Sequence, residues 1–164
     1  MNDQLLNLIT DQADREFFAS SVYAAAAQWC NGQSYAGSEA FLRHASDEER
    51  GHGLKMLTML NEYVAYAPTI PAVAAQPSNR FSSLLDIFQA ALNLEIEVTQ
   101  YIKDLTYYAK EVKSCEVEAW FMHEFLLEQI ASVSQMRTIV KLLQNCHEER
   151  AALLLADKLI GEMA

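Results

Sequence analysis

Glutamate and histidine stand close together in the segment DEERGHG, residues 47–53, inside a long stretch with helical character. Glu49 and His52 are three residues apart, a spacing that places both side chains on one face of a helix. An oxygen ligand and a nitrogen ligand on one face suit hard and borderline divalent metals. A solvated charged patch is the alternative, because acidic clusters usually face water. The direction in which each side chain points decides between the two readings.

Positions seven apart on a helix lie within about 20° of one another, so the residues in that register indicate where a polar side chain points. Glu49 shares its row with Leu42 and Met56, which predicts that it faces the core. Glu48 shares its row with Lys55, which predicts that it faces water. The inward stripe predicted for this helix is Leu42, Ala45, Glu49, His52, Met56, Met59 and Tyr63.

Three further helical stretches each carry an inward carboxyl or amide by the same comparison. Glu16 shares its row with Ile9 and Tyr23. Glu95 is in register with Phe88, so it too is expected to face the core. On the last of these stretches the inward stripe is Met122, Leu126, Gln129, Val133, Met136, Val140 and Leu143, with Gln129 as its polar member.

The inward polar groups are also expected at a common depth. Glu16, Glu49, Glu95 and Gln129 each lie about 12 to 14 residues from the expected start of their helix, which is the middle of helices of nearly 30 residues. A single buried glutamate or histidine is usually a hydrogen-bonded core residue. Three carboxylates in a layer without Lys or Arg are different, because burying unpaired charge is costly. Either their pKa values rise until some are protonated, or cations sit among them.

The helices that must position this layer are separated by one proline-rich segment. All three prolines fall in YAPTIPAVAAQPSN, residues 66–79, and proline breaks helices. Each half of the chain then reads as two long helices, which we expect at about residues 3–30 and 35–65, and at about 83–113 and 114–145. Ser83 opens the third with a capping-box pattern, Ser114 is the expected cap of the fourth, and ERAALLLADKLIGEMA predicts a shorter fifth helix.

Connection lengths predict how these helices are arranged. Short turns make each pair antiparallel, whereas a strap of about 15 residues can stretch about 50 Å and run the length of a bundle. The second and third helices are therefore expected to point the same way. The prediction is an all-α protein with one domain, 1–164, built as a four-helix bundle with a long crossover and a short fifth C-terminal helix.

Charge and composition exclude several classes of function. The net charge of −10 argues against nucleic acid as a partner, because phosphates are repelled by an acidic surface. No apolar run approaches the roughly 20 residues of a membrane span. The start, MNDQLLNLIT, lacks the basic and apolar parts of a signal peptide, so a cytoplasmic protein is expected.

Cys30, Cys115 and Cys146 are odd in number and form no CxxC, so we expect reduced and mostly buried thiols.

The chain resembles the ferritins over nearly its whole length. The resemblance is carried by REFFASSVYAAAAQWC, FLRHASDEERGH, NLEIEVTQYI and LLEQIAS, which stand in the order of ferritin helix segments. EExxH alone is a weak motif. It becomes specific when joined to a Glu seven residues before a Tyr on the first helix, a mid-helix Glu on the third and EQ on the fourth. The resemblance implies a ferritin-like bundle with a di-iron ferroxidase centre.

Carried over to this sequence, the resemblance implies two irons per subunit and oxidation of Fe(II) by O₂ or H₂O₂. Glu16, Glu49 and His52 would bind the first iron. Glu49 would bridge to the second iron, which Glu95 would complete. Two ferrous ions would bring four positive charges to three carboxylates, and such hard, open ligation allows Fe(III) to be released.

Two further residues have roles implied by the resemblance. Three other positions depart from the motifs of other ferritin-like proteins. Gln129 would hydrogen-bond iron-bound water or oxygen species, and Tyr23 would hydrogen-bond the site and can donate an electron. Ser132 stands where some prokaryotic ferritins have a Glu for a third iron. Ala131 stands where a second Glu-x-x-His would end, and Arg50 replaces the haem-binding Met of bacterioferritins, so no haem is predicted.

The function implied is an iron-storage ferroxidase that keeps ferric oxyhydroxide inside a homo-oligomeric shell of 24 subunits, whose four-fold axes the fifth helix lines. One alternative is a metal-binding or structural ferritin subunit with weak ferroxidase activity, although the ferroxidase ligands are all present. Another is a di-iron oxidase or peroxidase, which the missing second Glu-x-x-His opposes. The iron entry path and the mineral nucleation surface stay open.

Overall fold

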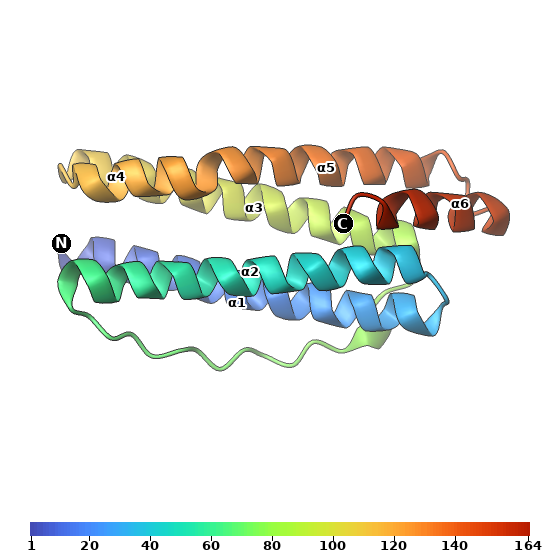
Figure 1. Ribbon diagram of the computed structural model, residues 1–164, viewed down its shortest axis with the longest axis horizontal. Helices are drawn as coiled ribbons and strands as arrows, with labels where there is room; N and C mark the ends of the chain where they lie inside the picture. The colour runs from blue at the N-terminus through green and yellow to red at the C-terminus, as the bar shows by residue number, and fades with distance from the viewer.

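The long helices expected from the sequence are present in the computed structural model, which describes all residues 1–164 (Figure 1). Its helices are α1 (Asp3–Gly32), α2 (Ala36–Val64), η1 (Ser78–Arg80), α3 (Leu84–Glu111), α4 (Cys115–Phe121), η2 (Met122–Leu126), α5 (Leu127–Gln144) and α6 (Arg150–Gly161). There is no strand, and the predicted all-α class is confirmed. No helix has both the length and the apolar composition needed to cross a membrane.

The crossover connection has the predicted path. Residues 65–83 run as an extended strap along the α1–α2 side from one end of the bundle to the other, so α2 and α3 point the same way (Figure 1). The tight turns on either side of the crossover use residues with positive φ, Ser34 at 62° and Lys113 at 60°. These turns reverse the chain within each helix pair, as the short connections predicted.

The two predicted caps differ in how their side chains are used. Ser83 Oγ accepts a hydrogen bond from the Asp86 backbone N–H at 3.1 Å, as a capping box requires. The return bond goes from the backbone N–H of Ser82 to the Asp86 carboxylate. Ser114 does precede α4, but its hydroxyl donates to Glu116 and caps no backbone N–H. The prediction that the Ser114 side chain caps the fourth helix is therefore wrong.

A π turn interrupts the fourth long helix and changes its register. The stripe drawn from the sequence included Met122, but this side chain is 47% exposed, while Phe121 and Phe125 are buried. The residues Met122–Leu126 form one π turn, which inserts an extra residue and moves the inward row by one position. The placement of Met122 in the core is thus wrong.

Of two smaller expectations about burial, one is wrong and the other, mostly buried thiols, is confirmed for two of three cysteines. Tyr63 was placed in the inward stripe of the second helix, yet it is 52% exposed. The inward row drifts by about 20° every seven residues, and Leu60 takes the buried position near the end of α2. Among the thiols, Cys30 and Cys146 are buried as predicted but Cys115, the first residue of α4, is exposed.

The apolar interior is divided into two clusters with a polar layer between them. On α1 the change from one cluster to the other falls between Phe17 and Tyr23, and on α3 between Leu92 and Val98. On α2 it falls between residues 45 and 56, and on the last long helix between residues 125 and 133. Each of the four predicted inward polar positions lies at or next to such a change, so the polar layer crosses the bundle at mid-height.

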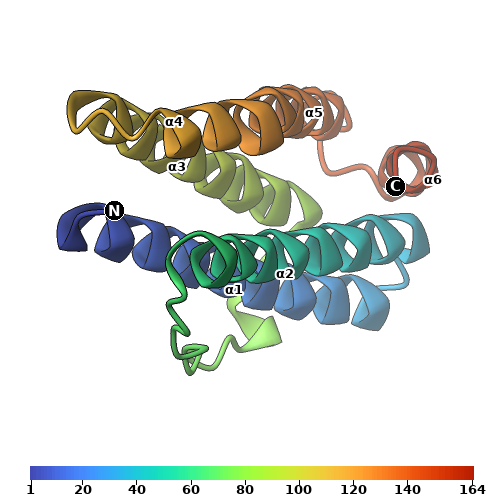
Figure 2. The same cartoon turned by 60° about the vertical axis from the view of Figure 1, so that its left-hand side comes forward.

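The C-terminal helix α6 is fixed to the start of α2. It packs against both α2 and α5, between the ends of these helices (Figures 1 and 2). The N-terminus of α2 has no side-chain cap of its own, and the Asp157 carboxylate accepts from the backbone N–H groups of Gly37 at 3.0 Å and Ser38 at 2.7 Å. Asp157 therefore acts as the missing cap from another helix.

Glycine at position 37 is required by this contact. A Cβ on Gly37 would lie 2.0 Å from the backbone oxygen of Asp157, whereas one on Gly51 would meet nothing within 4 Å. We expect Gly37→Ala to lose about 1–3 kcal/mol of stability, as overpacked sites do. Gly51→Ala is the matched control and should gain about 0.5–1 kcal/mol, because alanine favours a helix interior. Thermal unfolding measured by circular dichroism distinguishes them, and equal Tm values would contradict the tight docking of α6.

Candidate metal centre

The six side chains singled out from the sequence lie in or beside the polar layer. They come from four helices and surround one small volume, and five of the six are buried, with His52 partly exposed. This arrangement follows from the common depth of these positions and from the antiparallel pairing of the helices. The residues are Glu16 and Tyr23 on α1, Glu49 and His52 on α2, Glu95 on α3 and Gln129 on α5.

Three of these residues form a group that can hold a metal ion. One ligand atom each from Glu16, Glu49 and His52 lies within 4.8 Å of the others. His52 Nδ1 is 3.4 Å from Glu49 Oε2. Metal–ligand bonds of about 2 Å place two donors of one ion up to about 4 Å apart, so small side-chain movements bring all three onto one ion.

The other half of the layer is organised around Glu95. The Tyr23 hydroxyl donates to Glu95 Oε1, and the Gln129 amide donates to Glu95 Oε2. The same amide nitrogen is 3.3 Å from the backbone oxygen of Glu95. Both carboxylate oxygens are thus held by neutral donors, which orient Glu95 without neutralising its charge.

No Lys or Arg side chain compensates the three carboxylates, because none of the ion pairs involving Lys or Arg includes them. Burial raises the pKa of Glu49 to about 8, with the charges of Glu95 and other acids adding to it. Burial and then the neighbouring Glu49 carboxyl raise the pKa of Glu16 well above its usual range. Burial also raises the pKa of Glu95. Without bound metal, the layer would therefore retain protons that solvated glutamates release.

Tyr23 stays protonated in this layer. Burial and then the charge of Glu95 raise the pKa of Tyr23 well above its usual range. The phenol can therefore act as a hydrogen-bond donor throughout the physiological range.

One carboxylate oxygen in the layer has no partner. Glu16 Oε2 is buried without any hydrogen bond, although Glu16 Oε1 accepts from Gln12. An unpaired buried acceptor of this kind costs about 1–3 kcal/mol. A cation beside Glu16 Oε2 would supply the interaction that this oxygen lacks. The unpaired oxygen is therefore suited to be a metal ligand.

Two hollows reach the layer from the side between α2 and α5, which make no direct backbone contact. One, of about 210 Å³, is lined by both Glu49 and Glu95. The other, of about 470 Å³, is lined by Glu49, His52 and Glu128. Both walls are rich in polar groups, so a small hydrated ion can approach the carboxylates from this side.

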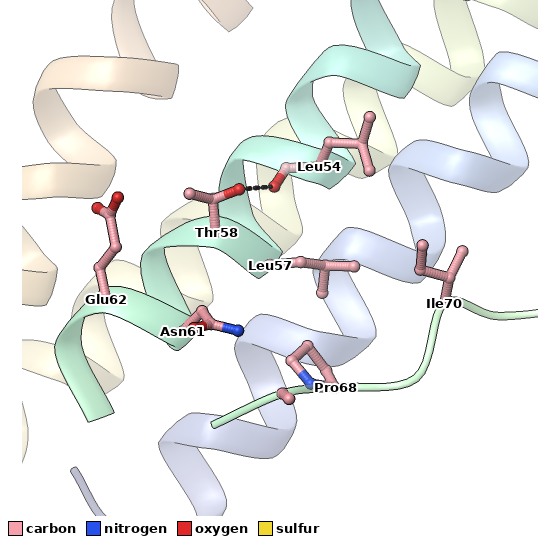
Figure 3. Close-up of a pocket in the computed structure, with 8 residues that line it drawn as sticks. Leu54, Leu57, Thr58, Asn61, Glu62, Pro68 and Ile70 are labelled. Atoms are coloured by element: carbon pink, nitrogen blue, oxygen red, sulfur yellow. Dashed lines mark hydrogen bonds between the residues drawn. The ribbon is translucent and has the colours of Figure 1, made fainter. Parts of the chain in front are cut away.

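A third hollow lies elsewhere and has a different character. Figure 3 shows it between the C-terminal half of α2 and the strap, where Leu57, Pro68 and Ile70 point into it. Its volume is about 360 Å³. It holds none of the residues of the polar layer, so it plays no part in the candidate centre.

Sequence reasoning assigned no role to three neighbours of the layer. Gln12 and Glu128 both contact predicted residues, Glu128 through an Oε1 atom 3.4 Å from His52 Nε2. Phe125 on the π turn packs edge-on against the His52 ring, with centroids 5.4 Å apart. The four-residue spacing of Gln12 from Glu16 was a visible signal. The contacts of Phe125 and Glu128 depend on packing between helices, which no local pattern records.

Known proteins match this chain over most of its length. The ferritin family profile, a ferritin-like domain, matches residues 6–146. The bacterial non-heme ferritin of Staphylococcus aureus strain USA300 is 34% identical over 161 residues, which span 98% of this chain and 95% of that protein. The bacterial non-heme ferritin of Staphylococcus saprophyticus is 31% identical over 160 residues, 96% of this chain and 93% of that protein.

Solved structures show the same fold. An open pore ferritin from the archaeon Archaeoglobus fulgidus superposes with a TM-score of 0.92 at 23% identity, covering 98% of both chains. A PmFTN variant crystallised and soaked in iron gives a TM-score of 0.89 at 28% identity, covering 96% of this chain and 99% of that one. The predicted four-helix bundle is thereby confirmed.

The raised pKa of Glu49 has a defined effect on stability. An unfolded chain releases this proton near pH 4.5 and the folded chain near pH 8, so the unfolded state binds fewer protons in between. Stability of the metal-free protein should therefore fall as pH rises from about 4.5 to about 8.

Glu49→Gln, which stays neutral, should have the higher Tm at pH 8 and no advantage near pH 4.5. Glu62→Gln, on the exposed face of α2, is the control. A pH-independent difference between wild type and Glu49→Gln would contradict the burial of an uncompensated carboxylate.

Proposed function

Since the chain belongs to the ferritin family, we propose that it is an iron-storage ferritin that oxidises Fe(II) within its polar layer and stores the Fe(III) as oxyhydroxide. The observation that carries the proposal is the set of three buried carboxylates without a Lys or Arg partner. Fe(II) is the substrate in this account. It supplies the positive charge that the layer lacks.

The proposed ligand set divides the layer into two iron positions. Glu16 and His52 bind the first iron, and Glu49 bridges to the second. The group of donors within 4.8 Å and the unpaired oxygen of Glu16 support the first position. Glu95 completes the second position, and its shared hollow with Glu49 supports this pairing.

Gln129 and Tyr23 orient the second position. Both donate to Glu95, and each Glu95 oxygen keeps a second lone pair that can bind iron. A donor that shifts off Glu95 when iron binds can hydrogen-bond a water or oxygen species beside the iron. Because both groups are neutral, they leave the negative charge of Glu95 available to the cation.

The electrons of the proposed reaction balance. Two Fe(II) ions carry four positive charges into a layer with three carboxylates, which leaves one net positive charge, and they displace the protons that Glu16 and Glu49 retain without metal. Each Fe(II) gives up one electron. Together they reduce one O₂ to H₂O₂ with the uptake of two protons, which is the advantage of placing two metals side by side.

A homo-oligomeric shell of 24 subunits is part of the proposal. It is supported by the family and by large apolar side chains exposed on α3 and α5 of one subunit. Tyr107 is 67% exposed, Leu127 72% and Ile130 55%. In a shell, neighbouring subunits would cover side chains of this kind.

The proposed reaction is tested by aerobic Fe(II) oxidation followed at the ferric absorption band. Glu49→Ala removes the bridging ligand and should slow the initial rate by at least about 10-fold, the range seen when groups around a metal are lost. Glu62→Ala removes an exposed glutamate of the same helix and should keep the wild-type rate. A wild-type rate no faster than that of Glu49→Ala would show that the layer is not the site of oxidation.

A further inference from the structure

Gln12 is a buried polar residue beside the layer with no role in the ligand set. It lies on α1 one turn before Glu16, is 2% exposed, and its Nε2 donates to Glu16 Oε1 at 2.7 Å. Its own Oε1 is buried without a partner. We propose that Gln12 is a positioning residue that holds one oxygen of Glu16 and leaves only the other to bind metal. The inference rests on the proposed function, since it concerns the same carboxylate.

The hydrogen-bond pattern of Glu16 carries this inference. A free carboxylate can bind a metal through one oxygen or through both. Here Glu16 Oε1 is occupied by the amide of Gln12, while Glu16 Oε2 has no partner. Glu16 is therefore set to bind through Oε2 alone, and its rotation is fixed before the ion arrives.

The choice of an amide at this position also points to a role in binding. The neighbouring inward residues of α1, Ile9 and Ala13, are apolar and 0% exposed. An apolar side chain at position 12 would fill the same space without leaving an unpaired buried acceptor, which is costly. A cationic side chain would hold Glu16 as well but would repel an incoming ion. Among these types, an amide orients the carboxylate and keeps its charge.

Co(II) is a suitable probe because it binds oxygen and nitrogen ligands and its visible absorption band reports coordination. In the assembled full-length protein, Gln12→Met removes the donor at nearly constant volume. We expect Co(II) to bind about 10–100-fold more weakly by titration calorimetry, the usual loss when a group that orients a ligand is removed. The absorption band should also change, because Glu16 is then free to bind through both oxygens.

Ile9→Met is the matched control, on the same helix and equally buried but with no hydrogen bond to Glu16. It should keep both the wild-type affinity and the wild-type band. Gln12→Leu, a second variant without a donor, replaces Gln12→Met if that protein does not fold.

The outcomes separate this inference from the proposed function. Wild-type affinity and an unchanged band in Gln12→Met or Gln12→Leu overturn the role of Gln12 while leaving the proposed function intact. A weakened affinity in Ile9→Met equal to that in Gln12→Met also overturns it, because the loss would then come from repacking of α1. Absence of Co(II) binding to wild type contradicts the proposed function and this inference together.

Discussion

The burial of three carboxylates without a lysine or arginine partner is the constraint on which the rest of this structure depends. Glu16, Glu49 and Glu95 lie at mid-height in a bundle whose apolar interior is divided around them. Such a layer weakens the metal-free protein, because ionised groups lose hydration that neutral hydrogen-bond donors replace only in part. Raised pKa values relieve part of this cost, and divalent cations would relieve more of it. The same feature that opposes folding therefore favours the binding of metal.

The surroundings of the layer keep the carboxylates in place without removing their charge. Glu95 is held by a phenol and an amide, and Glu16 by a second amide. None of these donors is cationic, so each orients an oxygen and still leaves an anion for the substrate. Stability is supplied away from the layer, by the two apolar clusters and by the docking of α6 through Asp157 on the start of α2. Folding and binding are thus assigned to different parts of one bundle.

Much of this arrangement could be predicted from the sequence because helical register is local. Rows of residues seven apart identified Glu16, Glu49, Glu95 and Gln129 as inward, and estimated helix starts placed them at one depth. The same rule failed at Met122, where a π turn adds a residue that no periodic pattern reveals. The cap that Asp157 provides for α2 and the bond from Gln12 to Glu16 also escaped prediction. Both depend on side-chain geometry, and the first joins residues about 120 positions apart.

Anomalous scattering at the iron edge from crystals soaked aerobically in Fe(II) tests the central claim most directly. The account predicts two iron peaks in the layer, one beside Glu16 and His52 and one beside Glu95, with Glu49 between them. It also predicts no third strong peak at Ser132, which offers a hydroxyl in place of a carboxylate. Iron bound only at the exposed acidic surface, with the layer empty, would contradict the account.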